Sequence, residues 1–237
     1  DHRRQYPEGT ELVYSNFTPR DSRIPGIDHV VVFGIQYFIK EFLIKRFNEE
    51  FFNVDKDVAV SKYKRRIDNY LGVDSVSMDH IEKLHDLGYL PLIIKALPEG
   101  TKSKIKVPVC TVFNTHKDFA WLVNFIETIF STTVWGPMTS ATIANEYRCI
   151  LDSYANQTSD DLEFVDFQGH DFSMRGMYGL EAASASGASH LLSFKGTDTI
   201  PAIDFLEKYY DADCTNEMIG VSVPATEHSV MCMGGSD

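Results

Sequence analysis

The sequence predicts an α/β protein whose pattern changes near residue 163. Before that position, long segments with mixed apolar and charged faces surround two shorter apolar segments bounded by Pro, Gly and Lys. After it, three short apolar segments each end in polar or glycine-rich residues, at 164–169, 190–195 and 219–224. Strand, loop and helix in this order and spacing are typical of a β/α barrel or of a doubly wound sheet.

The first part is expected to contain helices and two strands. A helix over about 30–52 is indicated by large apolar residues interrupted by charged ones. Another begins after Ser77, a favoured capping residue, and ends before Gly88, a common helix stop. The strands are expected at 90–97 and 105–113, and two further helices at 119–135 and 139–154, separated by Gly136-Pro137.

The second part places polar residues on the loops that follow its strands. A helix is expected at 200–210, and the small-residue run at 181–189 favours the start of another. In barrels, loops at the C-terminal strand ends carry the chemistry, here 171–176, 196–199 and 225–229. Three strands cannot close a barrel of about eight. The sequence also stops at Asp237 without a terminating element, so we expect it to be a piece of a longer chain.

The composition argues against several classes of protein. A formal net charge of −12 argues against broad nucleic-acid binding. No apolar run approaches the roughly 20 residues that cross a bilayer, and the first residues lack the apolar core of a signal peptide. The four cysteines are widely spaced without a CxxC pair, which predicts reduced thiols in a cytoplasmic protein and no zinc site.

His228 is the first candidate for chemistry. It follows the expected strand at 219–224 and lies between Glu227 and Ser229. A histidine in such a loop can act as a base, as a metal ligand or as a nucleophile toward phosphate. Taken alone, it is better explained as a structural histidine that is hydrogen-bonded within the loop.

Phe172, Arg175 and Asp198 are candidates for ligand binding. The Phe172 ring offers a flat face to an aromatic ligand, and Arg175 can donate to a carbonyl or a phosphate. Asp198 follows Gly196, and a glycine in a turn permits close approach of a ligand to the backbone. A core Phe, a surface Arg and an ordinary helix N-terminus explain the same residues without a ligand.

Ordered motifs through nearly the whole chain resemble the nicotinamide phosphoribosyltransferase family. These motifs are His2-x-x-Gln5-Tyr6-Pro7, Tyr14-Ser15-x-Phe17-x-x-Arg20, Ile94-Lys95-Ala96-x-Pro98-Glu99-Gly100, Ile126-Glu127-Thr128, His170-Asp171-Phe172-x-x-Arg175-Gly176, Phe194-Lys195-Gly196-Thr197-Asp198-Thr199 and Ser222-Val223-Pro224-Ala225-x-Glu227-His228-Ser229. The last three are long and occur in the family's order. Together they are highly specific, which makes chance similarity hard to defend.

The resemblance implies a longer, homodimeric enzyme that combines a split α/β domain with an irregular β/α (TIM-like) barrel. Residues 1–163 would then be the N-terminal part of the split domain, and 164–237 the first strands of a barrel that is incomplete in this chain. The implied reaction joins nicotinamide to the phosphoribosyl group of phosphoribosyl pyrophosphate, giving nicotinamide mononucleotide and pyrophosphate in NAD biosynthesis. It needs Mg²⁺ and is coupled to hydrolysis of ATP as a co-substrate.

The resemblance also assigns residues to the nicotinamide tunnel. By position, Phe172 would stack on the pyridine ring, and Arg175 would hold the carboxamide oxygen. Asp198 would accept a hydrogen bond from the carboxamide NH₂, and Ser222 should line the same tunnel.

Two further residues are assigned to phosphate chemistry. Arg20 should meet phosphates, and His228 would be the site of transient phosphorylation. For the other basic residues near the N-terminus, Arg3, Arg4 and Arg23, a solvated segment remains the simpler interpretation.

The sequence also departs from the family pattern. Met174 stands where a tyrosine often occurs, which would alter the pocket wall. The aromatic residue that closes over the ring from the partner subunit lies upstream of position 1 in the family, and later arginine, aspartate and glycine-rich turns lie beyond Asp237. We therefore expect this segment alone to be inactive.

Two alternatives are weighed against this function. Nicotinate phosphoribosyltransferase has the same reaction type, but it should place a cation opposite the substrate carboxylate, whereas Asp198 would repel it. A non-catalytic binding or scaffold protein would retain only the fold. Retention of Phe172, Arg175, Asp198 and His228 together argues against that second alternative.

Overall fold

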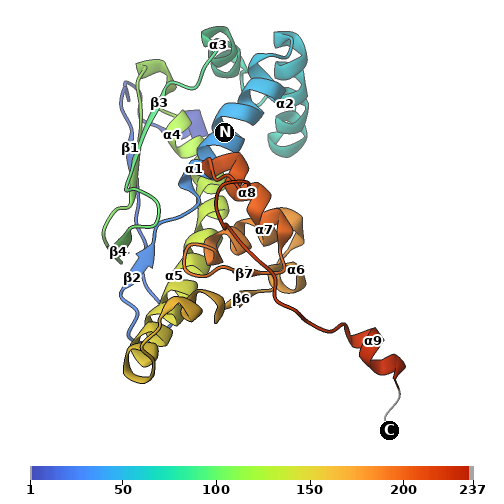
Figure 1. Ribbon diagram of the computed structural model, residues 1–237. Helices are drawn as coiled ribbons and strands as arrows, with labels where there is room; N and C mark the ends of the chain where they lie inside the picture. Colours follow the sequence, from blue (N-terminus) through green and yellow to red (C-terminus); the bar gives the residue numbers. More distant parts are fainter. Residues whose placement is uncertain (1, 235–237) are drawn as a thin grey trace. The chain divides into compact units, whose positions relative to one another are not determined.

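The computed structural model describes residues 2–234 (Figure 1). Asp1 and residues 235–237 lie outside the described residues, and so does the chain end at Asp237 that was expected to lack a terminating element. The chain forms two compact units, the first ending at Thr142 and the second beginning at Ile143. This division falls inside one long helix, earlier than the expected change near residue 163. The assignment of 1–163 and 164–237 to the two family domains stays a prediction.

The first unit contains an antiparallel sheet of three strands in the order β1-β5-β3. Its strands are β1 (Tyr14–Phe17), β3 (Leu92–Ala96) and β5 (Cys110–Asn114), with Cys110 opposite both Phe17 and Ala96. A separate ribbon pairs β2 (His29–Val31) with β4 (Lys102–Lys104). Alternate residues of β5 are buried, as expected for a strand with one face on the core. The strands predicted at 90–97 and 105–113 thus contain β3 and most of β5.

The helices of the first unit surround an aromatic core. Phe38 and Phe17 both meet the ring of Phe130 edge to face, at centroid distances of 4.9 and 5.0 Å. The helices are η1 (His2–Gln5), α1 (Ile35–Tyr37), η2 (Phe38–Arg46), η3 (Asn48–Phe52), α2 (Lys56–Leu71), α3 (Asp79–Leu87), η4 (Lys117–Phe119), α4 (Leu122–Phe125) and the first part of α5 (Glu127–Thr158).

Helix α3 lies where its terminal residues predicted it, and it ends at Gly88 as expected, but the residue at its N-cap position is Met78, which makes no side-chain capping bond. The Ser77 hydroxyl accepts a hydrogen bond from the Asp79 backbone N–H at 3.2 Å. At the other end, Gly88 adopts a left-handed conformation with φ of 76°, which a glycine reaches without strain.

The single helix predicted over 30–52 is wrong in its first turn and in its type. Residues 29–31 form β2, and the helical run begins only after Gly34, whose φ is 95°. A Cβ atom at Gly34 would lie 3.1 Å from the Pro137 Cβ, so the turn depends on close approach. The segments η2 and η3 that follow, of nine and five residues, are π-helical, a form that periodicity at 3.6 residues does not reveal.

The predicted break at Gly136-Pro137 is also wrong, because α5, which is 32 residues long in all, continues through Pro137. An internal proline costs a helix about 3 kcal/mol. Val134, Met138 and Ala141 around it are at most 4% exposed. Burying a Val or Met side chain contributes about 1.5–3 kcal/mol each, so packing on both sides of the proline outweighs its cost.

The second unit is a mixed α/β arrangement of short parallel segments and helices. Its elements after α5 are η5 (Glu163–Phe167), β6 (His170–Asp171), α6 (Ser173–Gly176), α7 (Gly179–His190), β7 (Gly196–Thr197), α8 (Ile200–Tyr210) and α9 (His228–Met233). Strands β6 and β7 are parallel, and Val221 forms a parallel bridge with Gly196. Helix α8 matches the prediction at 200–210.

The predicted strands of the second unit are displaced along the chain. The segment 164–169 lies mostly in η5, and 190–195 contains the end of α7 and the turn after it. Pairing occurs one residue beyond each of these segments. The small-residue run at 181–189 lies within α7, which packs closely beside α8 (Figure 1).

Candidate active site

Three polar side chains meet where the parallel segments of the second unit end. Asp198 directly follows β7, Ser222 directly follows the bridging residue Val221, and His170 lies on β6. The Asp198 Oδ1 lies 2.7 Å from His170 Nε2 and accepts a hydrogen bond from the Ser222 hydroxyl at 3.2 Å. The structure therefore brings together two predicted residues that are 24 positions apart in the chain.

The surroundings of Asp198 favour its charged form. The hydrogen bond from His170 is the main cause that lowers the pKa of the Asp198 carboxyl, with Ser222 and the positive charge of Arg175 acting in the same direction. The Asp198 side chain is 47% exposed, so the carboxylate is both ionised and open to a ligand.

Asp198 does not serve as an ordinary helix cap. The capping residue of α8 is Thr199, which makes no side-chain capping bond. Thr197 and Thr199 on either side of Asp198 are buried, as alternation along an extended segment requires. The Thr197 hydroxyl points inward and donates to the Asp171 Oδ2 at 3.0 Å. The outward position of Asp198 thus follows from the inward hydrogen bond of its neighbour.

Phe172 and Arg175 lie on the same side of the unit as Asp198. Phe172 precedes α6, and its ring centroid is 4.9 Å from that of His170. Its side chain is 54% exposed, which contradicts the core interpretation of this residue. Arg175 lies in α6, is exposed, and is near enough to contribute to the low pKa of Asp198. An aromatic face, a cation and a carboxylate are thus grouped at one edge.

His170 is a residue of this group to which the sequence assigned no role. It stands in the motif that begins His170-Asp171-Phe172, but its partner Asp198 is 28 residues away. The signal that could have revealed it is Gly196, which pairs with His170 in the parallel ladder. A Cβ atom at Gly196 would lie 2.6 Å from the His170 Nδ1, so only glycine leaves room for the imidazole.

His228 is not joined to this group in the part of the chain that the structure describes. It is the first residue of α9 and is exposed. The preceding Glu227 caps the helix, and its carboxylate accepts from the backbone N–H groups of Ser229 at 2.7 Å and Val230 at 3.2 Å. Within residues 2–234, no hydrogen bond or ion pair links His228 to Asp198. The structure leaves the predicted role of His228 untested.

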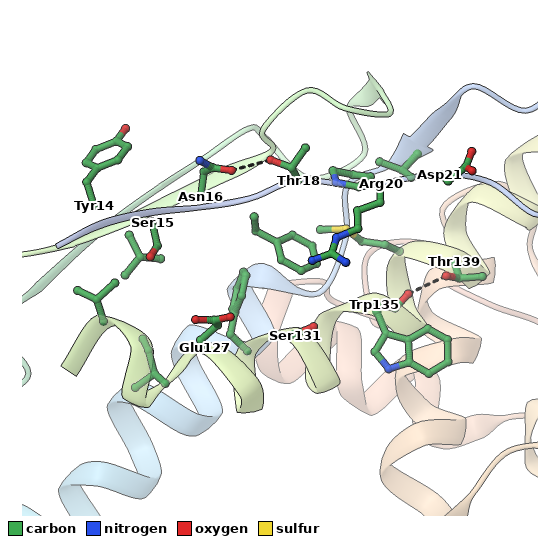
Figure 2. Close-up of a pocket in the computed structure, with 18 residues that line it drawn as sticks. Tyr14, Ser15, Asn16, Thr18, Arg20, Asp21, Glu127, Ser131, Trp135 and Thr139 are labelled. Carbon is green, nitrogen blue, oxygen red and sulfur yellow. Dashed lines mark hydrogen bonds between the residues drawn. The ribbon is translucent and has the colours of Figure 1, made fainter. Parts of the chain in front are cut away.

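Arg20 lines a separate pocket of about 930 Å³ in the first unit. The pocket lies between β1 with its following segment and the first half of α5, and apolar side chains such as Phe130 and Met138 form part of its wall. Figure 2 shows the Arg20 guanidinium directed from the strand side toward α5, where Glu127 and Ser131 are exposed to the pocket. An exposed cation over a partly apolar hollow is compatible with an anionic ligand.

The described residues contain no cage for a metal ion. Among residues 2–234, no three His, Cys, Asp or Glu side chains gather at metal-binding spacing. Mg²⁺ commonly keeps several waters and binds through substrate phosphates with one or two carboxylates, so it does not require such a cage.

Two further observations concern the whole described segment. None of its helices is long and apolar enough to span a membrane. No disulfide bond joins Cys110, Cys149, Cys214 or Cys232 in the part of the chain that the structure describes.

Comparisons with known proteins agree with the resemblance in the motifs. The profile of the nicotinamide phosphoribosyltransferase N-terminal domain matches residues 1–94, and that of the nicotinate phosphoribosyltransferase (NAPRTase) family matches 167–237. The chain is 57% identical to the nicotinamide phosphoribosyltransferase of Acinetobacter baylyi, with 100% of this chain and 47% of the relative aligned. The enzyme of that name from Mycoplasma genitalium is 31% identical, over 99% of this chain and 52% of the relative.

A solved structure shows the same fold at low sequence identity. The crystal structure of human nicotinic acid phosphoribosyltransferase has a TM-score of 0.59 and 17% identity, and the alignment covers 92% of this chain and 35% of that one. At this identity the likeness shows the fold alone. The chain spans about half the length of the curated relatives that it matches. These profiles and relatives show that the chain belongs to the family of nicotinate and nicotinamide phosphoribosyltransferases.

Proposed function

We propose that the full-length protein containing this chain transfers the phosphoribosyl group of phosphoribosyl pyrophosphate to nicotinamide, releasing pyrophosphate. The relatives that align with the whole chain carry the name nicotinamide phosphoribosyltransferase, one of them at 57% identity. The observation that carries the proposal is the ionised Asp198 carboxylate beside an exposed aromatic ring and a cation.

This group of side chains suits a neutral aromatic amide. A carboxylate only accepts hydrogen bonds and therefore pairs with the two N–H donors of a carboxamide. Arg175 supplies donors for the carboxamide oxygen, and the Phe172 ring supplies a face for the pyridine. With these contacts, the bound ring would present its nitrogen, which must attack the anomeric carbon of the phosphoribosyl group as pyrophosphate leaves.

Nicotinate is a poorer fit to the same group. Its carboxylate has no N–H to donate and would oppose the charge of Asp198 at hydrogen-bonding distance. Arg175 would offset part of this repulsion, and the exposure of Asp198 would screen it further. We expect a preference of at least about tenfold for nicotinamide to remain.

We also infer that the second unit is the start of an irregular β/α (TIM-like) barrel. The parallel segments run in chain order from β6 to β7 to Val221, with α7 and α8 as the intervening helices. Loops at the C-terminal ends of such strands carry the active site in barrels, as Asp198 and Ser222 would here.

The remaining parts of the proposal come from the family. A ring nitrogen of His228 would attack the γ-phosphorus of ATP, the bond to the bridging oxygen would break, and ADP would leave. Arg20 would contact substrate phosphates, and Mg²⁺ would enter with the pyrophosphate. The enzyme would be a cytoplasmic homodimer that acts on small molecules, with no nucleic acid or membrane partner.

The proposal is tested by the substrate preference of the full-length enzyme. We expect the wild type to convert nicotinamide at least about tenfold more efficiently than nicotinate, and Asp198→Asn to lose most of this preference. Asp204→Asn is the matched control, because Asp204 is exposed on α8 and, among the described residues, the hydrogen bonds of His170 and Ser222 to a carboxylate go to Asp198 instead. Equal efficiency of the wild type with both pyridines would contradict the nicotinamide proposal. A folded protein without product from either would support a scaffold.

A further inference from the structure

The hydrogen bonds of Asp198 are distributed unequally between its two oxygens. Both His170 and Ser222 contact Oδ1, and no hydrogen bond to Oδ2 is present among residues 2–234. We propose that His170 is a positioning residue that fixes Asp198 and leaves Oδ2 for the substrate carboxamide. This inference rests on the proposed function.

His170 is suited to positioning because its own ring is held in place. Its side chain is only 15% exposed, and its backbone is fixed by pairing with Gly196 in the parallel ladder. The space for its ring exists only because Gly196 lacks a Cβ atom, which would otherwise lie 2.6 Å from Nδ1. The Ser222 hydroxyl is exposed and free to rotate, so it is the weaker constraint on Asp198.

The position of the hydrogen between His170 and Asp198 follows from the chemistry of the carboxylate. A carboxylate cannot donate, so Nε2 carries the hydrogen that lies between the two side chains. The other ring nitrogen, Nδ1, is buried without a hydrogen-bond partner in the described chain. A buried polar atom without a partner is unfavourable for folding, which indicates that the ring is oriented for its contact with Asp198.

Without this contact, the Asp198 side chain would be poorly restrained. At 47% exposure it could adopt other rotamers and bind water through either oxygen. The substrate would then have to order the carboxylate on binding, which reduces affinity. Loss of the contact should therefore raise the KM for nicotinamide and reduce the preference for nicotinamide over nicotinate. It should change kcat little, because His170 does not touch the reacting atoms.

The test uses variants at His170 in the full-length enzyme. A glutamine amide nitrogen reaches about as far from the backbone as the imidazole Nε2, whereas an asparagine amide is shorter and a leucine has no donor. We expect His170→Leu and His170→Asn to raise the KM for nicotinamide about tenfold with little change in kcat, and to reduce the preference over nicotinate similarly. His170→Gln should restore both values to within about threefold of the wild type.

His190→Leu is the matched control. His190 is also a partly buried histidine of this unit, but its ring contacts the Gly169 carbonyl at 3.3 Å and stacks on Phe194, and no hydrogen bond joins it to Asp198 in the described chain. Its loss should reduce thermal stability without changing the preference for nicotinamide. If His170→Leu does not fold, the comparison of the asparagine and glutamine variants decides.

The outcomes separate this inference from the proposed function. A wild-type enzyme that does not prefer nicotinamide over nicotinate would contradict the proposed function itself. A wild type that prefers nicotinamide, together with folded His170→Asn of unchanged KM and preference, would overturn the positioning role alone. A His170→Gln variant that is as impaired as His170→Asn would also overturn the positioning role.

Discussion

The packing of α7 against α8 leaves no room for a methyl group at Gly187. An ideal Cβ atom there would lie 2.8 Å from the Ala202 Cβ, 2.9 Å from the Asp171 Oδ2 and 3.3 Å from the Thr199 Cβ. Ala202 and Thr199 are fully buried, and the Asp171 oxygen accepts a hydrogen bond from Thr197. The Ala202 and Thr199 atoms are Cβ atoms fixed to the backbone, and hydrogen bonds from Thr197 and Ser173 hold the Asp171 carboxylate, so the helices themselves would have to separate.

Two effects of Gly187→Ala oppose each other. Alanine is favoured over glycine inside a helix by about 1 kcal/mol. Overpacking a buried site costs about 1–3 kcal/mol, and contacts this short belong to the upper part of that range. We therefore expect a net loss of about 1–2 kcal/mol in the local stability of α7.

Hydrogen exchange in the full-length protein measures this loss directly. A loss of that size should accelerate exchange of the α7 amides by about five- to thirtyfold. Gly176→Ala is the matched control, because an added Cβ there meets nothing within 4 Å and α7 exchange should not change. Exchange in Gly187→Ala as slow as in the wild type would refute the packing argument.

Two further predictions concern titration and phosphoryl transfer. Burial beside Trp121 lowers the pKa of His80 to about 4, whereas an unfolded histidine titrates near 6.5. The unfolded state then binds more protons, so stability should fall as pH decreases from about 6.5 toward 4. In thermal melts over this pH range, the melting temperature of His80→Phe should depend less on pH than that of the wild type. In the full-length enzyme, His228→Ala should abolish ATP hydrolysis and acid-labile phosphate incorporation while some phosphoribosyl transfer persists. ATP stimulation of that variant at the wild-type level would exclude His228 as the acceptor.

Helices with local signals could be predicted from the sequence, whereas the paired strand segments were placed less accurately. Helices α3 and α8 begin and end near residues whose preferences act over a few positions, such as Ser77 and Gly88. The parallel segments β6 and β7 are only two residues long, so no run of alternating residues marks them. Their positions depend on partners about 26 residues away, as the pairing of His170 with Gly196 shows.

The same distinction between local and distant partners applies to the candidate site. Phe172, Arg175, Asp198 and Ser222 were predicted through ordered motifs, and the structure groups them at one edge of the second unit. The contact of Asp198 with His170 was not predicted, because it requires knowledge of which strands pair. Continuation of α5 through Pro137 was missed for a similar reason, since tertiary burial outweighed a local signal.

The geometry of the site depends on the register of these short strands. Side chains alternate along an extended segment, so a slip of one residue would turn Asp198 inward and Thr197 outward. Thr197 donates to the buried Asp171 carboxylate, and leaving that partner unsatisfied would cost about 1–3 kcal/mol. Gly196 adds a second restraint, because any other residue in its place would collide with the His170 ring. The inward hydrogen bond and the glycine together determine that the carboxylate of Asp198 is the group presented to a ligand.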